Sequence, residues 1–487
     1  MLARTLRLLL VTIFALAITG CGGAGKEEGD ATDPGVPDVG GVEEITTADG
    51  GSHDAPSSKA CNGVFLIQHP EGSPAEQPPG GADYVFEQEN LRTFQLEIDS
   101  DGWEGLKANP LEDQYGPATM IYEGLRYGPV GARFKGAWST LIGCFDEDGK
   151  QTCEKLSMKL RFNKYDPCGR FFGVRRLVFN SNVHDDSQLR ERLMYGLMGH
   201  IGMTASRATS SVLTVNDGPK GVYTLVESVD KAFLVDRFPD PEGNLYKQIW
   251  PIYDYPEPYL EALRTNEETD DVNRMLQFAD AIANTSVATF EEDLTPFVDL
   301  GNLARKMAFA RAIGDDDGIL RYWCESMFNP CQNHNYYWYD EPGGKIHLLP
   351  WDQDITFLGY REKDELALEW WEEPPQCTPV PLYILEGIED PSPSDYDLVL
   401  PPQCDILLRE SVLNRPDDYL DSLLQVQTGL GQSVVDLESY RAQLAGPLAA
   451  DTLLEPSMEE WEVEVDWLKK KMNQQIAVLD EYLAEAP

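Results

Sequence analysis

The chain has 487 residues, a formal net charge of −44, 42% hydrophobic residues and 10% aromatic residues. Such an excess of acidic groups repels nucleic acid and anionic membrane surfaces, so neither is expected as the main partner. The apolar content is high enough to build a large core, which excludes global disorder.

The amino terminus has the pattern of an export signal. A short basic region precedes an apolar run, Leu8 to Ile18, which is too short to span a bilayer comfortably. Small residues then lead to Cys21, and this arrangement resembles a bacterial lipobox, in which the cysteine is lipidated and becomes the mature first residue. We predict a signal peptide at 1–20 and a lipid anchor at Cys21, on the exported side of a bacterial cell-envelope membrane. The alternative is an ordinary signal peptide with an incidental cysteine.

The segment 21–60 is rich in Gly, Asp, Glu, Pro, Ser and Thr and has few large apolar residues. Such a composition cannot repay the entropy lost on ordering, so we predict a flexible acidic tether.

Eight cysteines remain after Cys21, and an even number in an exported chain favours disulfides. Proximity in the sequence predicts four pairs: 144 with 153, 324 with 331, 377 with 404, and 61 with 168.

Apolar and polar residues alternate in several segments that we interpret as strands. They lie at 93–98, 130–136, 156–162 and 173–180, with a turn predicted at 99–102. A helix is predicted next, because Leu189, Leu193, Leu197 and Ile201 share one face and Asp186-Ser187 offers an N-cap. Its periodicity alone leaves Glu191 as a solvated helical residue.

The later part of the chain is read as two hairpins and two helical regions. The hairpins lie at 211–227 and 336–349, and the helical regions at 270–312 and 410–485. Strands therefore come first and helices last, which is typical of an α+β protein.

Two polar segments are candidates for chemistry, 314–318 and 348–357. The second places Asp352 and Asp354 directly after an apolar strand, and in an extended chain two such carboxylates point to the same side. They repel each other unless a proton or a hard, oxygen-ligated cation neutralises them. The alternative is a surface turn with a capping aspartate, but the flanking apolar residues favour a partly buried functional site.

Seven motifs, taken in order, resemble those of the CotH family, which is named after a spore-coat protein. The resemblance runs from about residue 90 to the carboxy terminus. The motifs are Arg133-Phe134-Lys135-Gly136 with Ser139, Lys155 to Leu160, Asn180 with Asp186 to Glu191, Gly221 to Asp230, Asn244 to Lys247, His334 to Tyr339, and Pro350 to Asp354.

This resemblance implies an atypical protein kinase with a distant kinase-like, two-lobed fold. The CotH-like domain would cover 61–487, with a strand-rich lobe at 61–250 and a mostly helical lobe at 251–487. The implied reaction is metal-dependent transfer of a phosphoryl group from ATP to Ser or Thr of a protein, with Mg²⁺ or Mn²⁺ as the metal.

The resemblance also assigns roles to individual residues. Gly136 and Ser139 would lie in the loop over the phosphates, and Lys159 would pair with the ATP phosphates. Glu191 would orient that lysine, and Glu227 would sit near the nucleotide pocket.

The acidic roles follow from the later motifs. Asp317 would be the catalytic-loop carboxylate, with Asp315 and Asp316 as fallbacks. Asp352 would hold the metal, with Asp354 assisting. These roles suit phosphoryl transfer, which depends mainly on positioning and charge neutralisation.

The chain departs from the family at Arg321 to Gln332, a cysteine-bearing insertion between Asp317 and His334. This insertion obscures which Asp aligns with the family's catalytic carboxylate. Two alternatives to a kinase stay open, because an exported lipoprotein meets little ATP. One is a non-catalytic surface-binding or adhesion lipoprotein that reuses the fold, and the other transfers a different nucleotide-derived group.

Overall fold

The protein is represented by a computed structural model. It describes residues 66–112, 114–136, 141–146, 150–269, 271–315, 317–324, 331–359, 361–373, 377–382 and 397–485. Four residues singled out by the sequence lie outside these ranges: Cys21, Cys61, Ser139 and Asp316.

The first half of the chain builds an eight-stranded sheet in the order β1-β4-β3-β2-β7-β8-β6-β5, and β4 also pairs with β5. One edge of β4 pairs first with β1 and then with β5, so seven strands close into a barrel-like ring. All its pairings are antiparallel except β2 with β7. The strands are β1 (Leu66–Gln68), β2 (Arg92–Glu97), β3 (Gly116–Tyr122), β4 (Leu125–Phe134), β5 (Met158–Arg161), β6 (Arg176–Asn180), β7 (Ala208–Val215) and β8 (Lys220–Glu227).

Side chains alternate between the two faces of each strand, and those on the inner face fill the interior of this closed sheet. Phe94, Leu160, Leu177 and Phe179 are fully buried and belong to one hydrophobic cluster, with an edge-to-face contact between Phe94 and Phe179 at 5.3 Å between ring centroids. Closing the sheet on itself leaves few unpaired strand edges and gives each inward side chain a neighbour.

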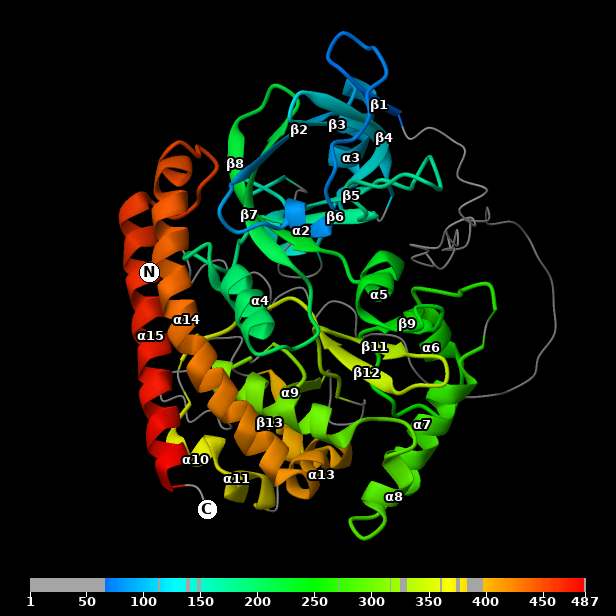
Figure 1. The fold of residues 1–487 in the computed structure, drawn as a ribbon, viewed down its shortest axis with the longest axis vertical. Coiled ribbons are helices and arrows are strands. Elements are labelled where there is room, and N and C mark those ends of the chain that lie inside the picture. Colours follow the sequence, from blue (N-terminus) through cyan, green and yellow to red (C-terminus); the bar gives the residue numbers. More distant parts are fainter. Residues whose placement is uncertain are drawn as a thin grey trace, which may run out of the picture.

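The second half is mainly helical and carries two small sheets, in the orders β12-β11-β9 and β10-β14-β13 (Figure 1). Their strands are β9 (Asn244–Lys247), β10 (Tyr322–Cys324), β11 (Tyr336–Asp340), β12 (Ile346–Pro350), β13 (Val380–Pro381) and β14 (Leu398–Leu400). The α-helices of the described residues are α2 (Ala82–Val85), α3 (Ser100–Ala108), α4 (Arg190–His200), α5 (Lys231–Arg237), α6 (Glu257–Ala262), α7 (Asn273–Asn284), α8 (Phe290–Leu294), α9 (Leu300–Ile313), α10 (Lys363–Leu366), α11 (Leu368–Glu372), α13 (Ile406–Asn414), α14 (Pro416–Ala449) and α15 (Met458–Glu485).

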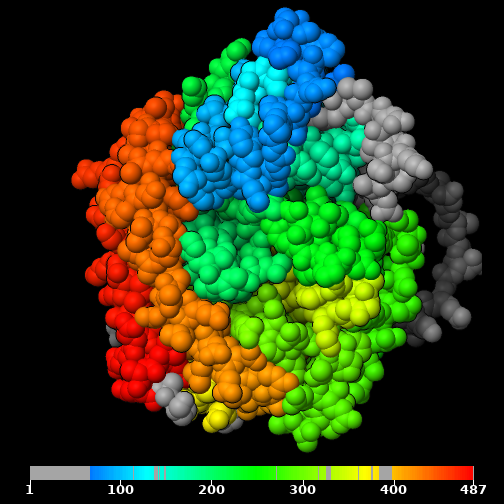
Figure 2. Space-filling model, viewed as in Figure 1, coloured from blue at the N-terminus to red at the C-terminus, as the bar shows by residue number. Residues whose placement is uncertain are grey.

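The two long carboxy-terminal helices, α14 and α15, run side by side along one flank of the molecule (Figures 1 and 2). Trp461, Val465, Leu468 and Met472 form the buried stripe of α15, as helical spacing requires. Helix α14 also contacts α9, α4 and β8, so it joins the helical half to the closed sheet. In the part of the chain that the structure describes, no helix combines the length and apolar character needed to cross a membrane.

Most predicted elements are confirmed, and two local predictions are wrong. Residues 99–102 do not form an isolated turn, because Asp99 caps helix α3 by accepting a hydrogen bond from the Gly102 amide at 2.8 Å. Helix α4 begins at Arg190, and the carboxylate that accepts its first amide belongs to Asp185, at 2.7 Å, rather than to the predicted Asp186-Ser187 pair. Both errors have one cause, since short polar residues favour turns and caps alike.

Three of the four predicted disulfides are present, Cys144–Cys153, Cys324–Cys331 and Cys377–Cys404. Cys168 is also disulfide-bonded. Its predicted partner, Cys61, lies outside the described residues.

Candidate active site

Three neighbouring strands present polar side chains on the outer face of the closed sheet. Lys159 of β5 stands opposite Arg133 of β4 and Val178 of β6. Because side chains two residues apart share a face, Lys135 and Asn180 lie on the same side as Lys159. This face looks toward α4, while the alternate residues of the strands fill the interior.

Lys135 is the centre of a chain of polar contacts. Its ammonium donates to Asn180 Oδ1 at 2.9 Å and lies 3.7 Å from Asp352 Oδ2. Asn180 Nδ2 in turn donates to Glu191 Oε2 at 2.6 Å. The side chains of Lys135 and Asp352 are 18% and 24% exposed, so this ion pair is open to solvent on one side. The next residue, Gly136, has a φ of +148°, which side-chain-bearing residues rarely adopt.

Glu191, on the first turn of α4, is 1% exposed. Burial, followed by repulsion from Asp352, raises the pKa of Glu191 to about 8, although Lys135 and Asn180 oppose the shift. Its second carboxylate oxygen, Oε1, is buried without a hydrogen-bond partner among the described residues. A carboxylate held in this way favours a proton or an added cation.

Asp352 and Asp354 follow β12, as predicted, but the chain between them is not extended. Asp352 has a φ of +56°, in the left-handed region, and its amide donates to the Tyr195 hydroxyl at 3.1 Å. The expected same-side geometry of an extended i, i+2 pair is therefore wrong. The carboxylates are nevertheless close enough to interact, because burial and repulsion from Asp352 and Glu191 raise the pKa of Asp354 well above its usual value.

A third lysine, Lys247 at the end of β9, faces the same region. Burial, followed by the positive charges of Lys159 and Lys135, lowers its pKa to about 8. Three lysines from the closed sheet and the small sheet therefore gather beside several carboxylates.

Asp317 lies in the loop after α9, which ends at Gly314 in a left-handed cap with φ +60° and ψ +51°. Asn335 Nδ2 donates to both the backbone oxygen and Oδ2 of Asp317 at 2.9 Å. His334 Nδ1 lies 3.8 Å from Asp317 Oδ1. The negative charge of Asp317 also contributes to the raised pKa of Asp354, so the two predicted acidic segments face one region.

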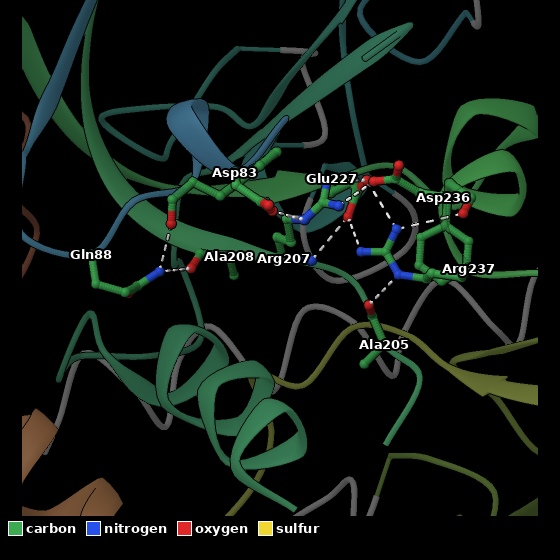
Figure 3. A network of polar contacts seen from close by, with 10 residues as sticks. Asp83, Gln88, Ala205, Arg207, Ala208, Glu227, Asp236 and Arg237 are labelled. Atoms are coloured by element: carbon green, nitrogen blue, oxygen red, sulfur yellow. Dashed lines mark hydrogen bonds and ion pairs between the residues drawn. The ribbon is translucent and has the colours of Figure 1, made fainter. Parts of the chain in front are cut away.

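Glu227, at the end of β8, is held in a separate ion-pair network (Figure 3). Its carboxylate accepts from Arg237 at 2.6 Å and from Arg207 at 3.2 Å, and Arg207 also pairs with Asp236 and Asp83. Burial raises the pKa of Glu227 and the two arginines oppose the shift. The network ties β8 to α5 and to the segment before β7.

The structure thus gathers Lys159, Glu191, Asp317, Asp352 and Asp354 in one region. Glu191 reaches Lys135 through Asn180, whereas the prediction paired it with Lys159. Among the described residues, no group of three His, Cys, Asp or Glu side chains is arranged to hold a metal ion by itself.

Sequence reasoning did not assign roles to Lys135, Asn180, Tyr195 and Lys247. Lys135, Asn180 and Lys247 lie within the quoted motifs, and this position was the sequence signal that could have identified them. Side chains alternate between the two faces along β4 and β5, which puts Lys135 on the same face as Lys159. This alternation could also have indicated Lys135 as a site residue.

The fold and site define a mixed α and β protein whose closed sheet presents lysines to a group of carboxylates. A family model described as "CotH kinase protein" matches residues 132–385. This match covers more than half of the chain and includes the whole site, so the chain belongs to the CotH family.

Two curated relatives and one solved structure are similar to this chain. The inner spore coat protein H of Bacillus subtilis (strain 168) is 23% identical over 283 residues, covering 55% of this chain and 70% of the relative. The inner spore coat protein H-like protein of the same organism is 32% identical over 79 residues, covering 16% of this chain and 24% of the relative. The crystal structure of a Helicobacter pylori proinflammatory kinase, CtkA, covers 77% of this chain and 94% of its own, with 9% identity and a TM-score of 0.29.

Proposed function

We propose that this chain is a protein kinase of the CotH type, which transfers a phosphoryl group from ATP to Ser or Thr of a protein in a metal-dependent reaction. The observation that carries the proposal is the contact chain from Asp352 through Lys135 and Asn180 to the buried Glu191. Membership of the CotH family supports it.

The charges of this region fit a nucleotide with a divalent cation. Lys135, Lys159 and Lys247 offer positive charge to phosphate oxygens, and Asp352 and Asp354 offer the oxygen ligands that Mg²⁺ or Mn²⁺ prefers. The buried, unpartnered Glu191 oxygen and the mutual repulsion of the carboxylates favour an added cation. When bound, such a cation would neutralise charge on the phosphates being transferred.

The remaining roles follow the same scheme. Lys159 binds phosphate oxygens, and Lys135, rather than Lys159, is the lysine that Glu191 orients through Asn180. Asp317 accepts the proton of the substrate hydroxyl, held in place by Asn335.

Gly136 and Ser139 belong to the loop over the phosphates. Glu227 anchors β8, because Arg207 and Arg237 both pair with its carboxylate.

A kinase-like division into two lobes, with the nucleotide between them, is part of the same proposal. Two hydrophobic clusters support it. One fills the closed sheet, and the other joins α4 and the outer face of that sheet to the later helices. The two hydrophobic clusters do not divide at residue 250, because α4 precedes that residue and packs in the same cluster as the later helices.

Nucleotide binding to the full chain tests this proposal. We expect ATP with Mg²⁺ or Mn²⁺ to stabilise the fold by roughly 2.7 kcal/mol at a hundredfold excess over its dissociation constant. Lys159→Met should remove most of that stabilisation, because the phosphates lose a positive charge. The measurement is the unfolding midpoint with and without nucleotide, followed by transfer of labelled phosphate to the protein or to a Ser-rich substrate.

Lys470→Met is the matched control, because Lys470 is an exposed lysine of α15 away from the site. Equal responses of the Lys159 and Lys470 variants would contradict the assigned role. If the wild type shows neither binding nor transfer with several nucleotides and both metals, the surface-binding alternative replaces the kinase.

We also propose that Cys21 is the lipidated amino terminus and anchors the protein to a bacterial envelope membrane. Its basis is the order of basic, apolar and small residues before the cysteine. Cys21→Ser should move the protein from the membrane fraction to the soluble fraction after cell lysis. Unchanged membrane association of the variant would contradict the anchor.

A further inference from the structure

A cavity of about 80 Å³, with both polar and apolar lining residues, lies apart from the three lysines of the candidate active site. It is enclosed by the segment after α4, by the middle of α9 and by the first turns of α14. A water molecule needs roughly 10–15 Å³ of such space, so the cavity has room for a small polyatomic ion. Its polar lining residues are Thr204, Asn302, Arg305, Lys306, Ser422 and Gln425.

Lys306 is the unusual member of this lining. It is 6% exposed, and its ammonium has no hydrogen bond or ion pair within the part of the chain that the structure describes. A largely buried ammonium without a close counter-ion is costly, because the charge has lost most of its contact with water. Burial accordingly lowers the pKa of Lys306 to about 8, and the negative charge of Asp299 only partly opposes the shift.

The rest of the lining offers donors rather than negative charge. The residues around the cavity include two cations, Lys306 and Arg305, and no Asp or Glu. Arg305 pairs with Asp418 at 2.6 Å and remains about half exposed. In a protein of net charge −44, a cavity lined by cations without carboxylates is suited to an anion.

Lys306 also lines a second, smaller cavity of about 10 Å³, on the side facing the candidate active site. Its other walls include Asp315, Asn335 and Gln353. Asn335 is the residue that holds Asp317, and Gln353 stands between Asp352 and Asp354. The larger cavity is therefore one layer of side chains away from the loops that carry the predicted acidic residues.

We propose that the cavity between the 201–204 segment, α9 and α14 binds a small oxyanion of the phosphate class, with Lys306 as its main ligand. The ammonium supplies up to three donors, and the amide and hydroxyl side chains of the lining supply neutral ones. The bound oxyanion would offset the cost of burying the Lys306 ammonium, which Asp299 offsets only in part. This site is separate from the proposed nucleotide site and does not depend on kinase activity.

The test is titration of the full chain with inorganic phosphate at constant ionic strength. Binding is measured by calorimetry and by the shift of the unfolding midpoint. We expect phosphate to bind the wild type and the Lys470→Met variant equally, because Lys470 is an exposed lysine of α15 away from the cavity. Lys306→Met should weaken phosphate binding at least about tenfold, since it removes a charge-assisted contact. Without phosphate, this variant should unfold at a higher temperature than the wild type, because an unpaired buried charge is gone.

Gln425→Glu is a second variant that keeps the size of the side chain and leaves Lys306 in place. Gln425 is exposed on α14, so the change does not threaten folding. The new carboxylate should oppose phosphate and pair with Lys306, again weakening phosphate binding and raising the unfolding midpoint of the phosphate-free protein. Lys470→Met serves as the control of equal charge change and should behave like the wild type.

O-phosphoserine is titrated in parallel to distinguish a free ion from a phosphoryl group carried by a larger molecule. Binding of both ligands identifies a site open to phosphomonoesters, and binding of phosphate alone identifies a site for the free ion. The proposal is overturned if phosphate binds the Lys306 and Gln425 variants as well as the wild type, or if it binds none of them. It is also overturned if Lys306→Met lowers the stability of the phosphate-free protein.

Discussion

Replacing Asp352 by asparagine is expected to reduce phosphoryl transfer by about a hundred- to a thousandfold, the usual cost of losing one well-placed electrostatic group. The metal-dependent part of ATP stabilisation should disappear with it. The fold itself should survive, because Lys135 keeps its hydrogen bond to Asn180 and one of several repelling carboxylates is removed. The metal-free, nucleotide-free variant should be as stable as the wild type or slightly more stable.

Asparagine is the right replacement because Asp352 has a left-handed φ of +56°. Among residues with side chains, Asn tolerates this conformation best, whereas alanine would add backbone strain to the loss of charge. Asp421→Asn makes the same charge change at an exposed position of α14 and is the control. Radiolabel transfer and thermal unfolding are measured for both variants. Wild-type transfer rates in Asp352→Asn, or a large loss of stability without metal, would show that Asp352 is a structural residue.

Glu191→Gln is expected to change how the stability of the metal-free protein depends on pH. The pKa of Glu191 is raised to about 8 in the folded protein, above its ordinary value near 4.5. The folded state therefore holds the proton more tightly than the unfolded state. Between these two values, the contribution of Glu191 to stability is lost as the pH rises, and the full penalty is present above about pH 8.

The glutamine variant has no carboxylate to ionise and should escape this loss. Its unfolding free energy should approach that of the wild type near pH 5 and exceed it near pH 9 by a few kcal/mol, with roughly 5 kcal/mol as the ceiling. Urea unfolding in the presence of a chelator measures the difference. Glu372→Gln, at an exposed end of α11, should show a pH-independent difference from the wild type. If the difference in unfolding free energy between Glu191→Gln and the wild type is also independent of pH, Glu191 ionises normally in the folded protein.

The same residue shows where sequence patterns stop being informative. The apolar spacing of α4 indicates one buried stripe and leaves Glu191 on the solvated side. In the structure, α4 is buried on nearly all sides, including Arg190, Glu191 and Arg192. A helix packed between a closed sheet and α14 keeps little solvated surface, and periodicity within the helix cannot report what packs around it.

The acidic pair after β12 shows a related limit. The sequence correctly indicated that Asp352 and Asp354 interact unfavourably, because their spacing and apolar surroundings bring two charges close together. The predicted backbone conformation was wrong, because the prediction assumed an extended chain between Asp352 and Asp354. Backbone conformation at one residue depends on contacts such as the one from the Asp352 amide to the Tyr195 hydroxyl, which come from a helix far away in the chain.

The sequence by itself determined the α+β composition, most strands and helices, three nearby disulfides and the motifs that place the chain in its family. These features depend on alternation, helical spacing and short separations, which are local properties of the chain. Only the tertiary structure decided that seven strands close into a ring, that Lys135 joins Asp352 to Glu191, and that Lys306 is buried beside a cavity. Each of these depends on which distant segments meet, and therefore on desolvation and charge proximity, which no local pattern encodes.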